Sequence, residues 1–289
     1  MEKIKSKYIK LFELIISVLV SLGFVYIFYK IIGFEKFFKF LKEISIINLL
    51  LAFSIYTLSY ITRAYRWKIT LTIKDFKKLF KLTVYNTVFN IFLPFRTGEI
   101  SFFYMLKKEN IPFNQSAISF ITVRIFDALS LAVVFAVSLL IYKDYIIYGI
   151  ILLVLSPSLF YIIKFLTGFI KMEKLKDFHK EVLSLKNILI LYLLSLTTYI
   201  FKFSSFYFVL PKNINISFLE NFFASASADL TTILPIHGIA GVGTYEAGYV
   251  GILIFLGVDK ETAILSSVFV HLFILLSSAI LSLICYTLP

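Results

Sequence analysis

The sequence predicts an all-α polytopic membrane protein with about six spanning helices and two re-entrant helical hairpins arranged as an inverted repeat. The first observation behind this prediction is composition. Of the 289 residues, 60% are hydrophobic, and the mean hydropathy is +0.91, whereas soluble domains are about 45–50% apolar. The second is that the charged residues gather between long apolar runs, which is typical of a helical bundle rather than a barrel.

Long apolar runs give the expected elements, because about 20 apolar residues cross the hydrocarbon core. The first run is too long for a signal peptide and lacks a small-residue cleavage site, so we expect it to stay as an uncleaved helix. Six runs qualify as spanning helices: 8–32, 44–64, 114–142, 145–167, 188–210 and 260–288.

Two further apolar stretches contain proline breaks. The first, 83–106, breaks at Pro94, and the second, 218–257, breaks at Pro235. We expect each to enter and leave the membrane on the same side. The chain is then one integral membrane domain (1–289) with four parts: two N-terminal helices and an interfacial anchor (1–67), a first repeat (68–142), connecting helices (143–217) and a second repeat (218–289).

The distribution of basic residues predicts the orientation. The net charge is +12, and lysines and arginines concentrate near residues 3–10, 63–81, 107–108 and 171–186. These stretches share one side only if 83–106 is re-entrant. The positive-inside rule then places both termini in the cytoplasm of a cell that carries the protein in its plasma membrane. Attraction to anionic headgroups is a second, compatible reason for the charge.

Residues 68–82 alternate lysines with apolar side chains at roughly helical spacing. Such a segment can lie in the headgroup plane. Trp67, the sole tryptophan, stands between Arg66 and Lys68, where an interfacial anchor belongs. We therefore expect helix two to end before this anchor.

Two glutamates lie in the proline-broken stretches, and each precedes a basic residue by the same interval. Arg124 follows Glu99 by 25 residues, and His271 follows Glu246 by 25. An offset of 147 also aligns Ser119 with Ser266. Three crossings separate the two sets, so we expect inverted repeats, a common build of transporters with a site near the midplane.

The chemistry of these breaks suits an anion. The first N–H groups of a half-helix form a positive end, and Arg96 and Arg124 add guanidinium groups whose geometry matches phosphate. We expect a lipid phosphate in a cavity between the repeats.

Each candidate side chain also has a structural alternative. Arg124 and Asp127 are three residues apart and can pair with each other, or Arg124 can serve substrate binding or gating. Glu99 can hold the hairpin through Arg96 or Arg124, or release its arginine when phosphate arrives. Lys202 can extend toward an interface or face the cavity.

Other functions have little support in the sequence. Two histidines 34 residues apart with one glutamate are a weak case for zinc, and Cys285 is the only cysteine. No nucleophile elbow, P-loop or metalloprotease motif is present. We expect no cofactor, no metal, no nucleic-acid partner and no enzyme activity, an intramembrane enzyme being the weakest of three hypotheses.

The segments Asn90–Glu99 and Gly241–Gly248 resemble the lysylphosphatidylglycerol synthase transmembrane family, the flippase-like membrane domain also found in the multiple peptide resistance factor. The Pro-x-Arg-x-Gly-Glu motif is fairly specific, whereas Pro235-Ile-His237-Gly238 departs from the family's usual Pro-Gly-Gly-x-Gly run. We expect this protein to lack the soluble aminoacyl-transfer domain of larger relatives. The resemblance implies substrate-binding roles for Arg96, Glu99, Gly241, Gly243 and Glu246; Arg124 and His271 come from the repeat, and Asp127 and Lys202 from their positions.

The resemblance implies the translocating half of such a protein. The first hypothesis is a flippase- or scramblase-like translocase for an anionic phospholipid or a polyprenyl-phosphate-linked sugar. The second is a non-transporting membrane partner that scaffolds a glycosyltransferase or another lipid-modifying enzyme, because related domains occur fused to glycosyltransferases.

Overall fold

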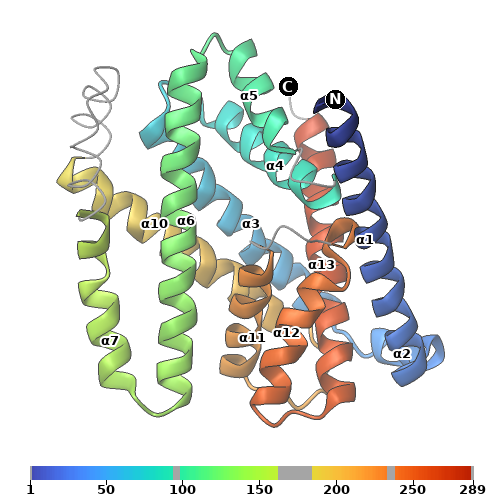
Figure 1. Ribbon diagram of the computed structural model, residues 1–289. Coiled ribbons are helices and arrows are strands. Elements are labelled where there is room, and N and C mark those ends of the chain that lie inside the picture. Colours follow the sequence, from blue (N-terminus) through green and yellow to red (C-terminus); the bar gives the residue numbers. More distant parts are fainter. Residues whose placement is uncertain (1, 94–97, 162–183, 233–237, 288–289) are drawn as a thin grey trace. The chain divides into compact units, whose positions relative to one another are not determined.

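The computed structural model describes residues 2–93, 98–161, 184–232 and 238–287, with side chains from residue 14 onward. All regular structure in these ranges is helical (Figure 1). The predicted all-α membrane fold is confirmed. The elements are α1 (Glu2–Ile31), α2 (Phe34–Leu41), α3 (Ile46–Thr70), α4 (Phe76–Phe92), α5 (Gly98–Lys108), α6 (Phe113–Tyr142), α7 (Ile146–Leu155), α10 (Leu185–Tyr207), α11 (Phe218–Thr231), η2 (Ile239–Gly241), α12 (Thr244–Phe255) and α13 (Lys260–Thr287).

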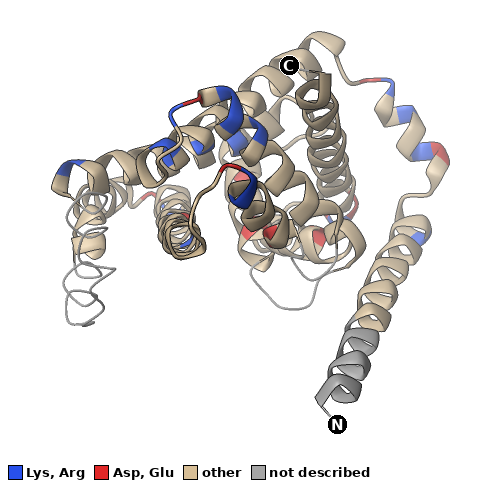
Figure 2. Ribbon diagram, turned by 90° about the horizontal axis from the view of Figure 1, so that it is seen from above, with Lys and Arg blue, Asp and Glu red and all other residues tan. Residues whose placement is uncertain are grey.

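Within the described residues, five helices are long and apolar enough to cross a membrane. They are Leu14–Ile31, Ile46–Thr70, Phe113–Tyr142, Leu185–Tyr207 and Lys260–Thr287, and they match five of the six predicted runs. The remaining run, 145–167, contains the shorter apolar helix Ile146–Tyr161, and its last residues lie outside the described ranges. Most of the helical length carries no charge (Figure 2).

Both proline-broken stretches form two helices with an interruption between them. In the first, α4 and α5 flank the interruption; in the second, α11 is followed by η2 and α12. Pro94, Arg96, Pro235 and His237 lie outside the described residues. Re-entry into the membrane and the inverted repeat remain predictions.

The chain divides into two compact units. The first contains Met1–Ile55, Val84–Phe102 and Phe203–Pro289, and the second contains Tyr56–Thr83 and Phe103–Lys202. The central parts of both broken stretches therefore belong to the same unit, although they are far apart in sequence.

In the first unit, the helices on the two sides of each interruption pack closely against each other. A Cβ atom on Gly98 would lie 2.3 Å from the backbone nitrogen of Asn90, so only glycine allows α5 to start this close to α4. Asn86 donates a 3.4 Å hydrogen bond from Nδ2 to the Gly98 carbonyl. In the second broken stretch, α12 packs between α11 and α13.

The second unit has an aromatic core. The rings of Phe126 and Phe160 stack with centroids 4.1 Å apart, and Ile188, Leu191 and Tyr192 complete the buried cluster. Helices α6 and α7 lie side by side (Figure 1). Ser119 donates a 2.6 Å hydrogen bond to the Thr70 carbonyl and so joins α6 to the end of α3.

The predicted end of helix two is wrong. Helix α3 continues to Thr70, so Arg63 and Arg66 lie within the spanning helix and not in a basic loop. Trp67 is only 6% exposed and packs inside the protein, which contradicts its prediction as an interfacial anchor. The segment 68–82 is also not one surface helix, because α3 ends at Thr70 and α4 begins at Phe76. Leu79 and Leu82 of α4 are buried against protein, which removes the apolar face expected to meet lipid.

Candidate functional site

The interruption between α11 and α12 depends on backbone conformations that favour glycine. Gly241 and Gly243 have φ values of 82° and 91°, and Ala240, the middle residue of η2, has a φ of 51°. A Cβ atom on Gly243 would lie 2.9 Å from both the side chain and the carbonyl oxygen of Val20 on α1. Gly241 and Gly243, predicted as substrate-binding residues, thus have a conformational role in this structure.

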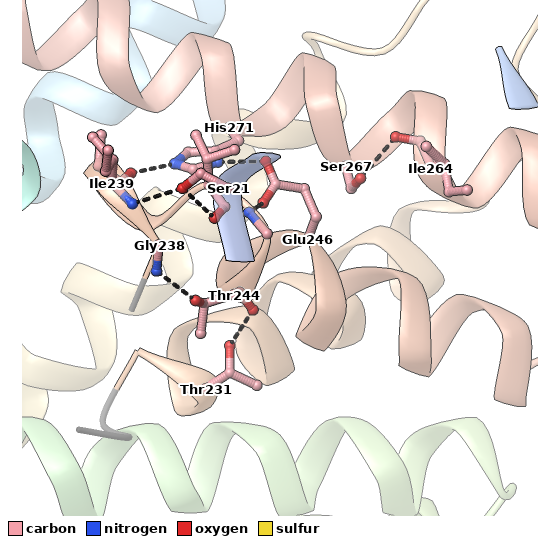
Figure 3. Close-up of polar contacts among 12 residues, drawn as sticks. Ser21, Thr231, Gly238, Ile239, Thr244, Glu246, Ile264, Ser267 and His271 are labelled. Atoms are coloured by element: carbon pink, nitrogen blue, oxygen red, sulfur yellow. Dashed lines mark hydrogen bonds and ion pairs between the residues drawn. The ribbon is translucent and has the colours of Figure 1, made fainter. Parts of the chain in front are cut away.

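Polar side chains hold the interrupted segment in place (Figure 3). Ser21 on α1 accepts a 2.8 Å hydrogen bond from the Ile239 N–H and donates one of 3.3 Å to the Val242 carbonyl. The Gly238 N–H donates to the hydroxyl of Thr244 at 2.9 Å. Because these backbone groups lie outside a regular helix, such partners are what satisfies them in an apolar surrounding.

Glu246 and His271 form a buried pair next to this segment (Figure 3). Glu246 Oε1 lies 2.6 Å from His271 Nδ1, and Glu246 Oε2 accepts a 2.6 Å hydrogen bond from the Gly243 N–H. His271 Nε2 lies 3.0 Å from the Ala240 carbonyl oxygen. The glutamate therefore caps the start of α12 and joins it to α13, and the histidine joins α13 to the interruption.

The structure thus brings Glu246 and His271 together in a direct contact that the sequence did not specify. Glu246 and His271 were expected to bind substrate, and in this structure they bind each other. Glu99 is half-buried in the first turn of α5. Glu99 belongs to the first unit and Arg124 to the second, so their pairing remains a prediction.

A second polar cluster occupies the spanning helices of the second unit. Arg66 on α3 is 2% exposed and forms an ion pair through Nη1 with Asp127 Oδ1 on α6. The same Nη1 donates a 2.9 Å hydrogen bond to the Ser195 hydroxyl on α10. Tyr199 on α10 donates a 3.1 Å hydrogen bond to the backbone carbonyl of Asp127. One arginine therefore links three helices.

Further guanidinium groups surround the same carboxylate. Arg63 and Arg124 both lie within electrostatic reach of Asp127. The Arg63 guanidinium carbon is 5.9 Å from the centroid of the Tyr60 ring, and that of Arg124 is 4.9 Å from the Phe120 ring. The predicted link between Arg124 and Asp127 is therefore electrostatic, and the hydrogen-bonded partner of Asp127 is Arg66.

Sequence reasoning missed Arg63, Arg66 and Ser21 as site residues. Arg63 and Arg66 were assigned to a loop because lysines follow them. Their three-residue spacing, which repeats that of Arg124 and Asp127, was the available signal. Ser21 has no signal in the sequence, because its partners are more than 200 residues away. Lys202 is half-buried on α10, and its proposed role in the cavity remains untested.

The chain matches the sequence profile of the lysylphosphatidylglycerol synthase TM region over residues 14–282. This match spans nearly the whole chain. The chain belongs to that family. A search of curated proteins found no match. The broken stretches and both polar clusters lie within the matched range, so membership in the lysylphosphatidylglycerol synthase TM family links this membrane protein to lipid handling.

Proposed function

We propose that the protein translocates an anionic phospholipid or a polyprenyl-phosphate-linked sugar, moving the headgroup past polar side chains while the tails stay in the bilayer. The observation that carries this proposal is the excess of basic residues on the spanning helices of the second unit. Apart from the exposed Lys68 and Lys186 near their ends, helices α3, α6 and α10 contain four basic residues, namely Arg63, Arg66, Arg124 and Lys202, and one acidic residue, Asp127.

An apolar surrounding makes this excess costly. A basic side chain at the centre of a bilayer costs about 2.5–3.5 kcal/mol or more. Such residues therefore face the bundle interior, pair with side chains of opposite charge or bind ions. Asp127 is the one acidic side chain on these three helices, and three guanidinium groups act on it. A phosphate diester adds negative charge and accepts paired N–H donors in the geometry that guanidinium groups present.

Arg63 is the group in this cluster that is best placed to meet such a ligand. Arg66 is fully buried and already holds Asp127 and Ser195. Arg63 differs from Arg66 in being only half-buried, and the Nε of each is a buried donor without an acceptor among the described residues. We therefore assign Arg66 to structure and Arg63 to contact with the phosphate.

The test is lipid exchange in liposomes that contain the purified protein and a labelled anionic lipid. We expect the wild type to equilibrate the label between leaflets. We expect Arg63→Gln to slow exchange by roughly ten- to hundredfold, because it removes hydrogen bonds to a charged group worth about 1.5–3 kcal/mol. Lys68→Gln is the matched control, because Lys68 lies on the same helix and is exposed.

Two outcomes overturn the proposal. In the first, the wild type moves neither the phospholipid nor a polyprenyl phosphate. In the second, Arg63→Gln exchanges lipid as fast as the wild type. A protein that moves no lipid but co-purifies with a lipid-modifying glycosyltransferase supports the scaffold alternative instead.

The orientation belongs to the same proposal, with both termini in the cytoplasm and the protein in the plasma membrane. Single cysteines at positions 107 and 108, introduced in a Cys285→Ser background, test it by thiol labelling from each side. Labelling of these positions only from outside contradicts the proposed orientation and the re-entrant first stretch.

A further inference from the structure

We propose that Glu246 and His271 form a binding site for one exchangeable proton, and that loss of this proton weakens the connection between residues 238–243, which precede α12, and α13. The site would make the proposed lipid translocation respond to pH. That last step rests on the proposed function, whereas the proton site itself does not.

The contacts fix the number of protons in the pair. The Ala240 carbonyl can only accept a hydrogen bond, so His271 Nε2 must carry a hydrogen to contact it. One more proton must lie between Glu246 Oε1 and His271 Nδ1 to make their 2.6 Å contact a hydrogen bond. Whether that proton is drawn on the carboxyl or on the imidazole, the pair has the same total charge of zero.

Removing that proton leaves the pair with one hydrogen for two contacts. If the remaining imidazole hydrogen stays on Nε2, the lone pair of Nδ1 faces the glutamate carboxylate. If it moves to Nδ1, the lone pair of Nε2 faces the Ala240 carbonyl. One of the two contacts is therefore lost in either tautomer, and a carboxylate remains in a site where Glu246 is 3% exposed. That charge is costly in an apolar surrounding.

The lost contact has a mechanical consequence. His271 is the described side chain on α13 that bonds both to η2, through Ala240, and to the first turn of α12, through Glu246. Glu246 also caps the Gly243 N–H. When the pair opens, the interruption keeps its hydrogen bonds to Ser21 on α1. The segment can then move with α1 independently of α13.

Other ionisable groups on the packed elements do not replace this function. The Tyr245 ring lies against the His271 ring at a tilt, with centroids 4.9 Å apart, and a phenol stays neutral near neutral pH. Asp229 on α11 is buried, and Tyr249 on α12 donates a 2.5 Å hydrogen bond to Asn221. The remaining ionisable side chains described on α1, α11, α12 and α13 are Tyr26, Tyr29, Lys30, Glu220, Lys260, Glu261, Cys285 and Tyr286.

Histidine is in general the side chain whose charge changes between about pH 5 and 8. A proton released on one side of the membrane and taken up from the other would connect the motion of the interrupted segment to a proton gradient.

Glu246→Gln provides a close test. A glutamine amide donates a permanent hydrogen to His271 Nδ1, and its carbonyl accepts from the Gly243 N–H, so the variant keeps every contact but cannot exchange the shared proton. Protein in lipid nanodiscs is titrated while infrared difference spectra record the carboxyl band. We expect the carboxyl and imidazole bands of the wild type to change in one step as a single proton leaves the pair, and this coupled signal to disappear in Glu246→Gln.

The control for this measurement is Glu220→Gln, which alters a glutamate of the same unit that caps α11 near the surface. We expect this variant to keep the coupled signal. A wild-type spectrum that is unchanged between pH 5 and 8, or a coupled signal that persists in Glu246→Gln, overturns the proton site. Neither result depends on lipid movement.

Lipid exchange then tests the coupling. We expect the rate of the wild type to change with pH by up to about tenfold per unit, the limit for one exchanging proton, and that of Glu246→Gln to be constant. A wild type that exchanges lipid at the same rate at all pH values overturns the coupling while the translocase proposal stands. A wild type that moves no lipid but shows the coupled spectrum overturns the translocase proposal while the proton site stands.

Discussion

Among the described residues, a buried pair of a basic and an acidic side chain joins helices in each unit, and the two pairs differ in their basic partner. Arg66 pairs with Asp127 in the second unit, and His271 pairs with Glu246 in the first. A guanidinium keeps its proton at all physiological pH values, whereas an imidazole does not. The same task of joining spanning helices is thus performed once by a permanent charge and once by a charge that can be removed.

The difference between the two pairs matches the structural surroundings of Arg66 and His271. Arg66 joins three regular helices and has a hydroxyl as a further partner. His271 joins a regular helix to an interrupted segment that contains three positive φ values. A permanent pair suits a fixed framework, and a titratable pair suits a segment that moves.

The largest expected effect separates the two pairs directly. Asp127→Asn leaves the fully buried Arg66 without its counter-ion, and we expect the free energy of unfolding to fall by about 3–5 kcal/mol. Glu246→Gln leaves no unpaired charge, and we expect a loss below about 1 kcal/mol. Chemical unfolding of both variants in detergent measures the two values. Equal losses would remove the distinction between the pairs.

The next effect concerns the interrupted segment. Gly243→Ala places a Cβ 2.9 Å from Val20 at a φ of 91°, and we expect it to cost about 1–3 kcal/mol. Gly251 on α12 has open space around its Cα, so Gly251→Ala should stabilise the helix by roughly 0.5–1 kcal/mol. Thermal unfolding compares them. If both variants behave alike, the segment does not need its glycines.

A third variant tests whether Arg66 depends on a network or on Asp127 alone. Ser195→Ala removes one acceptor from the buried guanidinium, and we expect a loss of about 1.5–3 kcal/mol. Thr197→Ala is the control, because Thr197 lies on the same helix and its hydroxyl donates a hydrogen bond to the backbone carbonyl of Leu193. The difference between the denaturation midpoints of the two variants measures how much the Ser195 hydroxyl contributes to stability. No difference would show that Asp127 alone holds Arg66.

The smallest effect compares the buried carboxylates with an exposed one. The backbone N–H of Thr262 lowers the pKa of Asp259, which caps α13. A lowered pKa in the folded state means that the stabilisation is present above the ordinary value, about 3.9, and is lost as the pH falls through the folded-state pKa.

We therefore expect Asp259→Ala to cost about 1 kcal/mol at neutral pH and progressively less in acid, measured as unfolding free energy against pH. Asp259→Asn keeps a capping oxygen and should be nearly neutral throughout. A cost of Asp259→Ala that changes near neutral pH would show that exposed carboxylates contribute to the pH dependence that we assign to Glu246.

The sequence alone determined the class of protein and most of its elements. The hydrophobic runs gave five spanning helices within a few residues, because a spanning helix needs only length and apolar composition. It also located both interruptions, because proline and glycine act on their own backbone. The equal spacing of Glu99 to Arg124 and of Glu246 to His271 pointed to related sites, and the structure shows a direct contact between Glu246 and His271.

Only the tertiary structure decided which charges are buried and what they contact. Arg66 was predicted in a loop because its sequence neighbours are basic, yet α6 and α10 bring Asp127 and Ser195 to it. In the sequence Ser21 is one small polar residue in an apolar helix, and only the fold brings η2 into contact with it. Composition and spacing are local and can be read along the chain, whereas the partner of a buried polar group is set by helices that pack together only in the fold.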